Sequence, residues 1–148
     1  MTQGDEAPAA WAALVPELNV RDLARSLAFW VGLCGFSVAY GRPAEGFAYL
    51  ERGRLQVMLE AIAPDSWITA PLEPPLGRGL NLQMEMADLA PIEAALAAAG
   101  WPLFRPPEER WYRVGGIEHG QRQLLVQDPD GYLLRFCEPL GERAAGSI

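Results

Sequence analysis

The 148-residue sequence has few of the residues on which metal centres and nucleophilic catalysis usually depend. It contains two cysteines and a single histidine, His119. Cys34 and Cys137 do not have the close spacing of zinc ligands, and one histidine leaves no credible Ser-His-Asp or Cys-His arrangement. The sequence also has no glycine-rich phosphate-binding loop. Two cysteines in a chain of this size indicate reduced thiols and a cytoplasmic location.

Net positive charge is also absent. The chain carries 12 basic and 19 acidic residues, which gives a formal net charge of −7. A protein that binds nucleic acid needs a basic face for the phosphates, so this balance argues against a nucleic-acid partner. The acidity is compatible with a cationic ligand, although solubility alone explains most acidic surfaces.

No apolar run approaches the roughly 20 residues of a membrane-spanning helix, so we expect no membrane segment. The first ten residues include Asp5 and Glu6 and no basic residue, which argues against a secretory signal. We expect residues 1–13 to form a flexible N-terminal tail and residues 140–148 a C-terminal tail. Half of the residues are hydrophobic, which is sufficient for one compact domain with a core.

The most informative stretch lies near the C-terminus. Residues 124–127 and 133–138 are predicted strands, and Asp128-Pro129-Asp130-Gly131 between them holds strong turn-forming residues in order. Arg135 lies within the second strand, between two apolar residues. It either reaches the sheet edge or lines a polar cavity, because burying an unpaired guanidinium is costly.

The rest of the chain follows an internal repeat. Val20-Arg21-Asp22-Leu23-Ala24 parallels Met86-Ala87-Asp88-Leu89-Ala90, and the offset is far longer than that of solenoid repeats. Each half is predicted as a strand, a helix and three strands. Neither half buries both faces of its sheet alone, so we expect an α+β fold of two βαβββ modules whose curved mixed sheets surround a cavity.

The predicted boundaries follow from the apolar patterns and from the breaks between them. The first module comprises residues 14–62, the proline-rich connector 63–79 and the second module 80–139. Strands are predicted at 14–20, 36–40, 47–52, 55–62, 80–86 and 101–105, with helices capped by Asp22 and Asp88. Pro106-Pro107 is predicted to break its strand, residues 111–114 form a short strand or an ordered loop, and Gly115–Gly120 is a loop that carries His119.

Together these features resemble the vicinal oxygen chelate superfamily over residues 14–138. The resemblance rests on the two βαβββ modules, on Leu27-Ala28-Phe29-Trp30 and Gly35-Phe36 around the end of the first helix, and on the closing Asp128-Pro129-Asp130-Gly131-Tyr132. The superfamily includes glyoxalase I, extradiol dioxygenases, fosfomycin-resistance enzymes and bleomycin-resistance proteins. The opening segment 15–22 is most similar to the bleomycin-resistance group. In that group an early proline accompanies exchange of the N-terminal arm, so Pro16 implies an arm-exchanged homodimer; an edge-strand proline explains it equally well.

The resemblance also indicates where a metal would bind, but the residues of this chain at those positions are poor metal ligands. Enzymes of the superfamily hold a divalent metal with His, Gln or Glu, two ligands from each module. The matching positions are Val15, Asn81, Arg135 and, on the strand 55–62, either Glu60 or Val57. At most one carboxylate remains, so we expect no bound metal and no cofactor.

Binding members of the superfamily hold a flat ligand group between aromatic side chains. The resemblance places one of these at Phe47 and the other, a tryptophan in the binders, at His119 or Gly120. Arg113 and Arg135 favour an anionic group, which suits cationic bleomycin poorly. The predicted ligand-binding residues are Phe47, Glu60, Trp111, Tyr112, Arg113, His119 and Arg135.

Several of these residues also have ordinary structural explanations. A core or cavity-lining position is the common one for a strand aromatic such as Phe47, and a solvent-exposed one for a loop histidine such as His119. Glu60 and Arg135 are compatible with a structural ion pair.

These observations favour a cytoplasmic homodimer that sequesters a small, partly aromatic molecule, as antibiotic-resistance proteins of the bleomycin type do. The alternative is a lyase or isomerase of the glyoxalase or dioxygenase type with an atypical or absent metal, in which Glu60 or His119 acts as the general base. A third possibility is a structural or regulatory dimer with an unused cleft.

Overall fold

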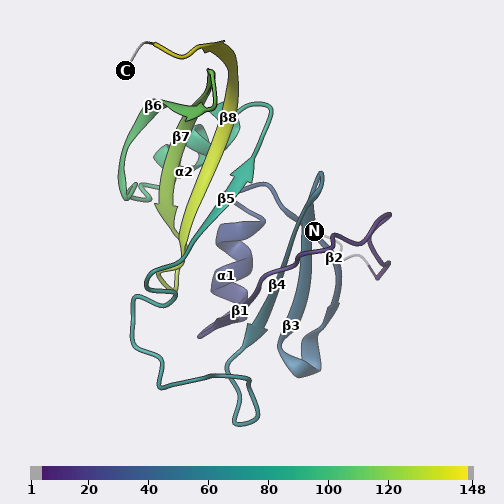
Figure 1. The fold of residues 1–148 in the computed structure, drawn as a ribbon. Helices are drawn as coiled ribbons and strands as arrows, with labels where there is room; N and C mark the ends of the chain where they lie inside the picture. The colour runs from purple at the N-terminus through teal and green to yellow at the C-terminus, as the bar shows by residue number, and fades with distance from the viewer. Residues whose placement is uncertain (1–4, 147–148) are drawn as a thin grey trace. The chain divides into compact units, whose positions relative to one another are not determined.

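The computed structural model describes residues 5–146, which fall into two units. Unit 1 comprises the chain through Leu76 together with Asp128–Asp130, and unit 2 comprises Gly77–Gln127 and the residues from Gly131 onward. Each unit contains one four-stranded mixed sheet and one α-helix (Figure 1). The predicted α+β fold of two βαβββ modules is therefore confirmed. No helix within residues 5–146 has the length and hydrophobicity needed to cross a membrane.

Unit 1 carries its core between α1 and one face of its sheet. Its elements are β1 (Glu17–Val20), α1 (Leu23–Trp30), β2 (Ser37–Arg42), the short 3-10 helix η1 (Pro43–Glu45), β3 (Phe47–Arg52) and β4 (Leu55–Ala61). The strand order is β1-β4-β3-β2, with β1 parallel to β4 and the other pairs antiparallel. Asp22 caps α1 as predicted, because its side chain accepts a hydrogen bond from the Arg25 N–H at 3.1 Å. Phe29 and Trp30 of α1 are fully buried.

Unit 2 repeats this order with longer strands. Its elements are β5 (Asn81–Glu85), α2 (Ala90–Ala98), β6 (Arg105–Val114), β7 (Ile117–Gln127) and β8 (Leu133–Ala144). The strand order is β5-β8-β7-β6, and only β5 and β8 are parallel. The Asp88 side chain accepts a hydrogen bond from the Ala90 N–H at 2.9 Å, although Leu89 occupies the cap position of α2.

The two faces of the unit 2 sheet differ in composition because successive residues of a strand point to opposite sides. One face holds the fully buried Leu124, Val126, Leu134 and Phe136. Glu93 of α2 forms an ion pair at 2.8 Å with Arg122, which shares this face, so this is the face that α2 covers. The alternate residues, among them Gln123, Leu125 and Arg135, belong to the other face.

The prediction that Pro106-Pro107 ends a strand is wrong. Residues 101–104 are irregular, and β6 begins at Arg105 and continues through both prolines. β6 is an edge strand, and the register of its ladder shifts between Arg105 and Glu108. The prolines therefore lie in a bulge on an edge, where a missing N–H costs no ladder hydrogen bond.

The predicted loop at Gly115–Gly120 and the predicted C-terminal tail are also too long. β6 and β7 are joined at Gly115-Gly116, so His119 lies in β7, opposite Tyr112. Gly115 has φ of 64°, a left-handed conformation that glycine adopts without a Cβ clash. β8 continues to Ala144, so the predicted tail at 140–148 begins inside a strand; residues 147–148 lie outside the described residues.

Residues 6–12, predicted as part of a flexible tail, are instead held against unit 1. The Gln56 side chain accepts a hydrogen bond from the Ala12 N–H at 2.8 Å and donates one to the Ala10 carbonyl at 2.6 Å. The Trp11 ring packs edge-on against Tyr40 and Tyr49, with centroids 6.0 Å and 5.3 Å away. Residues 1–4 of the same predicted tail lie outside the described residues.

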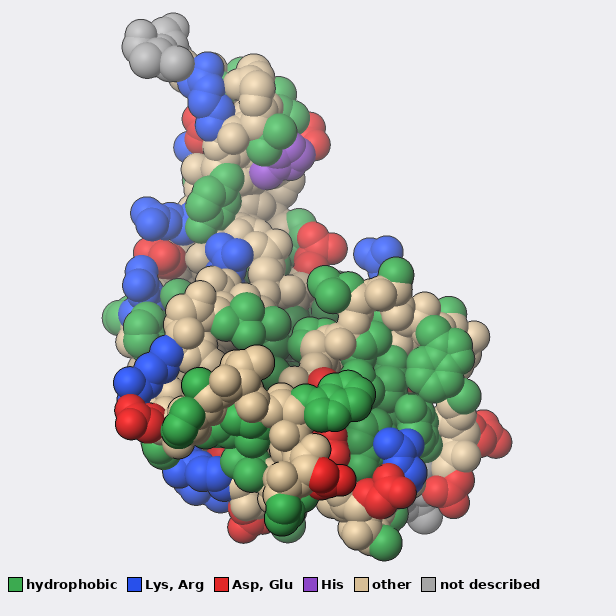
Figure 2. All heavy atoms as spheres, turned by 60° about the horizontal axis from the view of Figure 1, so that its bottom comes forward, with side chains coloured by type: hydrophobic (Ala, Val, Ile, Leu, Met, Phe, Trp, Pro, Cys, Tyr) green, Lys and Arg blue, Asp and Glu red, His purple; other side chains and the backbone are tan. Residues whose placement is uncertain are grey.

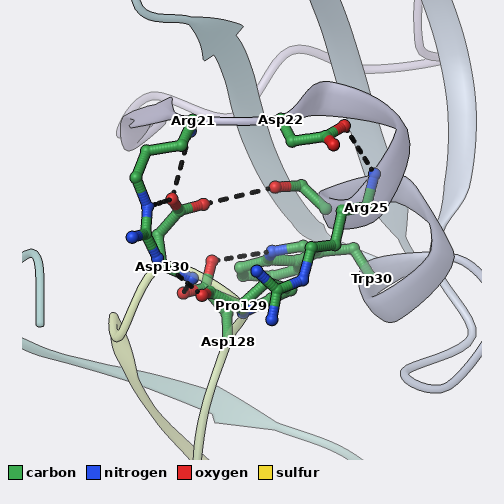
Figure 3. A network of polar contacts seen from close by, with 8 residues as sticks. Arg21, Asp22, Arg25, Trp30, Asp128, Pro129 and Asp130 are labelled. Atoms are coloured by element: carbon green, nitrogen blue, oxygen red, sulfur yellow. Dashed lines mark hydrogen bonds and ion pairs between the residues drawn. The ribbon is translucent and has the colours of Figure 1, made fainter. Parts of the chain in front are cut away.

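The turn Asp128-Pro129-Asp130 is anchored within unit 1 by two buried carboxylates (Figure 3). Asp130 accepts hydrogen bonds from Arg21 Nε at 2.8 Å, from the Arg21 N–H at 3.1 Å and from Ser26 Oγ at 3.4 Å. Asp128 accepts from Trp30 Nε1 at 3.3 Å and from the Asp130 N–H at 3.0 Å. The turn is confirmed, and its carboxylates bind the start and the buried side of α1.

We expect Asp130→Ala to destabilise the fold, because it removes the acceptor of three donors at a position that is only 3% exposed. The loss in the free energy of unfolding should be about 1–3 kcal/mol, the cost of leaving buried donors unsatisfied. Urea denaturation of the wild type and the variant measures this difference. Asp65→Ala, at an exposed position of the connector, is the matched control and should change stability by less than about 0.5 kcal/mol. Equal midpoints for Asp130→Ala and the wild type would contradict the assignment.

Candidate functional site

A cleft of about 230 Å³ lies on the face of the unit 2 sheet that α2 does not cover. Three arginines line it: Arg105 and Arg110 from β6 and Arg135 from β8. The ladder brings them together, because Leu125 of β7 pairs with Arg105 on one side and with Arg135 on the other. The alternation of β-strands therefore places these cationic side chains over one apolar floor.

The charges of the cleft are unbalanced. Glu108 is the single acidic side chain among the lining residues, and its Oε1 lies 3.5 Å from Arg110 Nε and 4.0 Å from Arg105 Nη1. Arg135 is different, because its Nε is buried and has no hydrogen-bond partner among the described residues. Of the two expectations for Arg135, the structure supports the polar cavity. The lining carries three positive charges and one negative charge, which favours an anionic occupant.

Tyr112 of β6 is held in the same cleft by polar contacts. The Gln123 side-chain amide donates a hydrogen bond to its phenolic oxygen. Burial alone would raise the pKa of Tyr112. Hydrogen bonds from Gln123 and Arg110, with the charges of Arg135 and Arg110, outweigh this and hold the pKa of Tyr112 below its ordinary value. The cleft thus stabilises negative charge on an oxygen atom.

Of the remaining residues predicted in the second module, none lines this cleft. Trp111 and Arg113 are on the opposite face of β6 from Tyr112. The guanidinium of Arg143 lies 4.1 Å from the centroid of the Trp111 ring, and Arg113 donates a hydrogen bond to the Gly146 carbonyl at 3.1 Å. His119 is exposed, with its Nδ1 3.6 Å from Glu142 Oε1.

Phe47, expected either to stack on a ligand or to lie in the core, lies in a packed aromatic cluster of unit 1. It is 4% exposed, and its neighbours in the cluster are Ala39, Tyr49, Tyr40, Val15 and Met58. The Arg42 guanidinium lies 3.9 Å from the centroid of its ring. Figure 2 shows hydrophobic side chains gathered on the right of the view, over the part of unit 1 that carries β2 and β3.

Glu60 lies opposite Phe47 in the β3–β4 ladder and next to a second carboxylate, Glu17. Burial, a hydrogen bond with Glu60 and the charge of Glu60 all raise the pKa of Glu17, while the Arg42 guanidinium opposes them. The two carboxyl groups therefore favour sharing a proton. Repulsion between the two carboxylates makes this part of unit 1 less stable when both are ionised.

The residues that the resemblance matches to the superfamily's metal positions do not fit a metal ion. Val15 packs in the apolar cluster of unit 1, and Arg135 brings a positive charge. Val57 is buried and has no donor atom in its side chain, and Asn81 offers only a neutral amide, so Glu60 is the only carboxylate among the candidate positions. Within residues 5–146, no group of three or more His, Cys, Asp or Glu side chains is placed to hold a metal.

The two cysteines are not suited to act as nucleophiles. Both are buried and free of disulfides. Burial raises the pKa of the Cys34 thiol to about 12, an effect that the Arg52 guanidinium partly offsets. Burial also raises the pKa of Cys137. A thiol that stays protonated at neutral pH is a poor nucleophile.

Sequence reasoning missed Arg105, Arg110 and Gln123, although it found Tyr112 and Arg135. The sequence does contain a signal for this face: Glu108, Arg110 and Tyr112 are spaced two residues apart, so in a strand they point to the same side. The break predicted at Pro106-Pro107 concealed it, because it placed Arg105 and Tyr112 in separate elements.

No family model and no curated protein matches the chain. Among solved structures, TioX from Micromonospora sp. ML1 is 23% identical, with 88% of this chain and 100% of that chain covered and a TM-score of 0.66. The bleomycin-binding protein complexed with bleomycin is 24% identical, with coverages of 86% and 98% and a TM-score of 0.57. These two likenesses show the vicinal oxygen chelate fold.

A third solved structure establishes the family through its sequence. It is a glyoxalase/bleomycin resistance protein/dioxygenase superfamily member from Vibrio splendidus 12B01, 36% identical to this chain, with 84% of this chain and 95% of that chain covered and a TM-score of 0.39. At this identity over almost the whole relative, the chain belongs to the glyoxalase/bleomycin resistance protein/dioxygenase superfamily.

Proposed function

We propose that this protein binds and sequesters a small, partly aromatic molecule without transforming it. The observation that carries the proposal is the cleft of unit 2, in which polar groups converge over an apolar floor. Ligand sites in proteins are concave and combine apolar side chains, here Phe104, Leu125 and Leu133, with polar groups that fix the orientation of the ligand. Binding of this kind requires no nucleophile and no metal.

The site residues and one relative support binding over catalysis. Val15 and Arg135 occupy positions at which superfamily enzymes hold a metal, and neither side chain is suited to ligate a cation. The bleomycin-binding protein, similar in fold, is complexed with a small molecule. We infer protection against a toxic small molecule, such as an antibiotic, as the biological role.

A second candidate function, a lyase or isomerase of the same superfamily, is favoured by Tyr112. A residue with a perturbed pKa in a cleft is a candidate acid or base. The lowered pKa of Tyr112 makes it better placed than His119, which is exposed and lines no part of the cleft. Recovery of the bound molecule unchanged, measured by mass spectrometry, separates sequestration from turnover.

The proposal includes a cytoplasmic homodimer with an exchanged N-terminal arm. Large apolar side chains are exposed in the described chain at Trp67 (93%), Leu14 (84%) and Trp11 (59%), and a second subunit would cover such side chains. Residues 10–12 bind Gln56 through hydrogen bonds that an identical arm from a partner would reproduce. The free, buried thiols are compatible with the cytoplasm.

A ligand panel tests the proposed binding directly. We expect at least one molecule among metal-free bleomycin, copper-loaded bleomycin and other planar antibiotics and aromatic metabolites to raise the melting temperature. At a hundredfold excess over Kd the rise should be about 5–10 °C for a protein of this size. Phe104→Ala, in the cleft wall, should weaken the binding about tenfold, whereas Leu72→Ala, in the connector, should leave it unchanged. The absence of any shift across the panel would refute the proposal.

The Glu17–Glu60 pair predicts a pH dependence of stability. Because the pKa of Glu17 is raised in the folded chain above its ordinary 4.5, its contribution is most favourable at low pH and is lost as the pH rises through the folded pKa. We expect Glu17→Gln to raise the melting temperature at neutral pH and to lose this advantage in acid, below the ordinary pKa. Glu109→Gln, at an exposed position of β6, is the control. Parallel pH profiles for wild type and Glu17→Gln would contradict the shared proton.

The oligomeric state tests the dimer. Light scattering on the full-length protein should give twice the 16.2 kDa mass of one chain. Deletion of residues 1–13 should increase the monomeric fraction, because it removes the arm that is exchanged. A full-length protein that remains at the mass of one chain would refute the dimer, and a truncated protein that remains fully dimeric would refute the arm exchange.

A further inference from the structure

The chain concentrates positive charge in one place although it is acidic as a whole. All 12 of its basic residues are arginines, against 19 acidic residues. Three of these arginines line the unit 2 cleft with a single glutamate. A chain with this net charge has no general reason to gather guanidinium groups on one apolar floor, so the cluster indicates a ligand of opposite charge.

Among the cleft arginines, Arg135 has a donor, its Nε, whose partner is missing among the described residues. Arg105 and Arg110 both approach Glu108, at 4.0 Å and 3.5 Å, but the buried Nε of Arg135 has no partner among the described residues. A buried donor without a partner is costly and rare in folded proteins. A carboxylate bound over Leu125 and Leu133 of the lining would draw the guanidinium toward the cleft and supply the missing oxygen acceptor.

Tyr112 supplies a second group that faces the ligand. Its phenolic oxygen accepts hydrogen bonds from Gln123 and Arg110, so both act on the oxygen and leave the phenolic O–H to donate. The planar guanidinium of arginine matches the two oxygens of a carboxylate in a bidentate arrangement. Arg135 and Tyr112 together therefore provide donors for the oxygens of one carboxylate.

The size and the walls of the cleft limit the rest of the ligand. Its volume of about 230 Å³ is below the roughly 300–1,000 Å³ that is typical of drug-sized sites. Leu125 and Leu133 form an apolar floor, and Phe104, half exposed, offers an aromatic face. Aromatic rings pack favourably against such a surface. A bare inorganic anion would leave this surface uncovered.

We propose that the cleft of unit 2 binds a small aromatic carboxylate, with the carboxylate held by Arg135 and Tyr112 and the ring against Phe104 and Leu125. This inference rests on the proposed binding function and names the class of ligand. Arg105 and Arg110 add to the positive field, which strengthens the attraction at low ionic strength.

Calorimetric titration with three probes tests the class of ligand. Benzoate should bind to the full-length protein, and the binding should weaken as salt is added. Benzamide, which has the same ring without the charge, should bind at least tenfold more weakly. Inorganic phosphate should also bind more weakly than benzoate. Phosphate binding as tight as that of benzoate, or equal binding of benzamide, would overturn the proposal.

Substitution of Arg135 places the binding in the cleft. Arg135→Met keeps an unbranched side chain as far as the Nε position and removes both the charge and the unpartnered Nε. We expect benzoate affinity to fall at least tenfold, while the melting temperature without ligand stays the same or rises, because the buried donor is gone. Arg113→Met makes the same change on the opposite face of the unit 2 sheet and should leave benzoate affinity within twofold of the wild type. Equal affinities for all three proteins would refute the assignment.

Tyr112→Phe provides a second test that does not depend on the folding of the Arg135 variant. Tyr112 is 40% exposed, so the change should not unfold the chain. Benzoate affinity should fall severalfold through loss of the O–H donor; unchanged affinity would contradict the role of Tyr112.

Failure of this inference is distinguishable from failure of the proposed function. If neutral or cationic planar molecules bind and benzoate does not, the binding function stands and the carboxylate is wrong.

Discussion

The structure depends on the fact that each sheet has two faces but only one α-helix to cover them. Each unit has one four-stranded sheet, which has two faces, and one α-helix, which covers one of them. Because strand residues alternate between faces, every strand supplies the helix-covered core and the uncovered face at the same time. In unit 2 the buried Leu124 and Leu134 belong to the first set, and Leu125 and Arg135 to the second. The site is therefore formed by the same strands that make the core.

The two units use their uncovered faces differently. In unit 1 the face is filled by its own aromatic side chains, with Phe47 and Tyr49 at 4% and 2% exposure. In unit 2 the corresponding face is polar and cationic, and it leaves a cleft. A closely packed aromatic surface leaves no cleft for a small ligand, whereas the unit 2 face has a cleft with an unpartnered guanidinium nitrogen. This difference is why the binding hypothesis rests on unit 2.

The sequence predicted the fold better than the site, and the reasons are physical. The repeat, the cap at Asp22 and the turn at Asp128-Pro129-Asp130 depend on local residues, so local patterns reveal them. The path of β6 cannot be predicted from local residues. Its two prolines are tolerated only on an edge strand, and whether a strand lies at an edge is a property of the assembled sheet. Trp111 and Tyr112 are a similar case: their opposite orientations appear only once residues 111–114 are known to form a strand.

The edge position of β6 has a further consequence for how the protein behaves at high concentration. An exposed strand edge is a template on which another chain can add a strand, and such addition leads to aggregation. The paired prolines lack N–H donors, and the bulge at residues 105–108 interrupts the regular spacing of the carbonyls. Intermolecular β-pairing is therefore disfavoured at the start of β6, near Arg105. The same irregularity that concealed the cleft in the sequence thus protects the end of its rim at Arg105 from the addition of another strand.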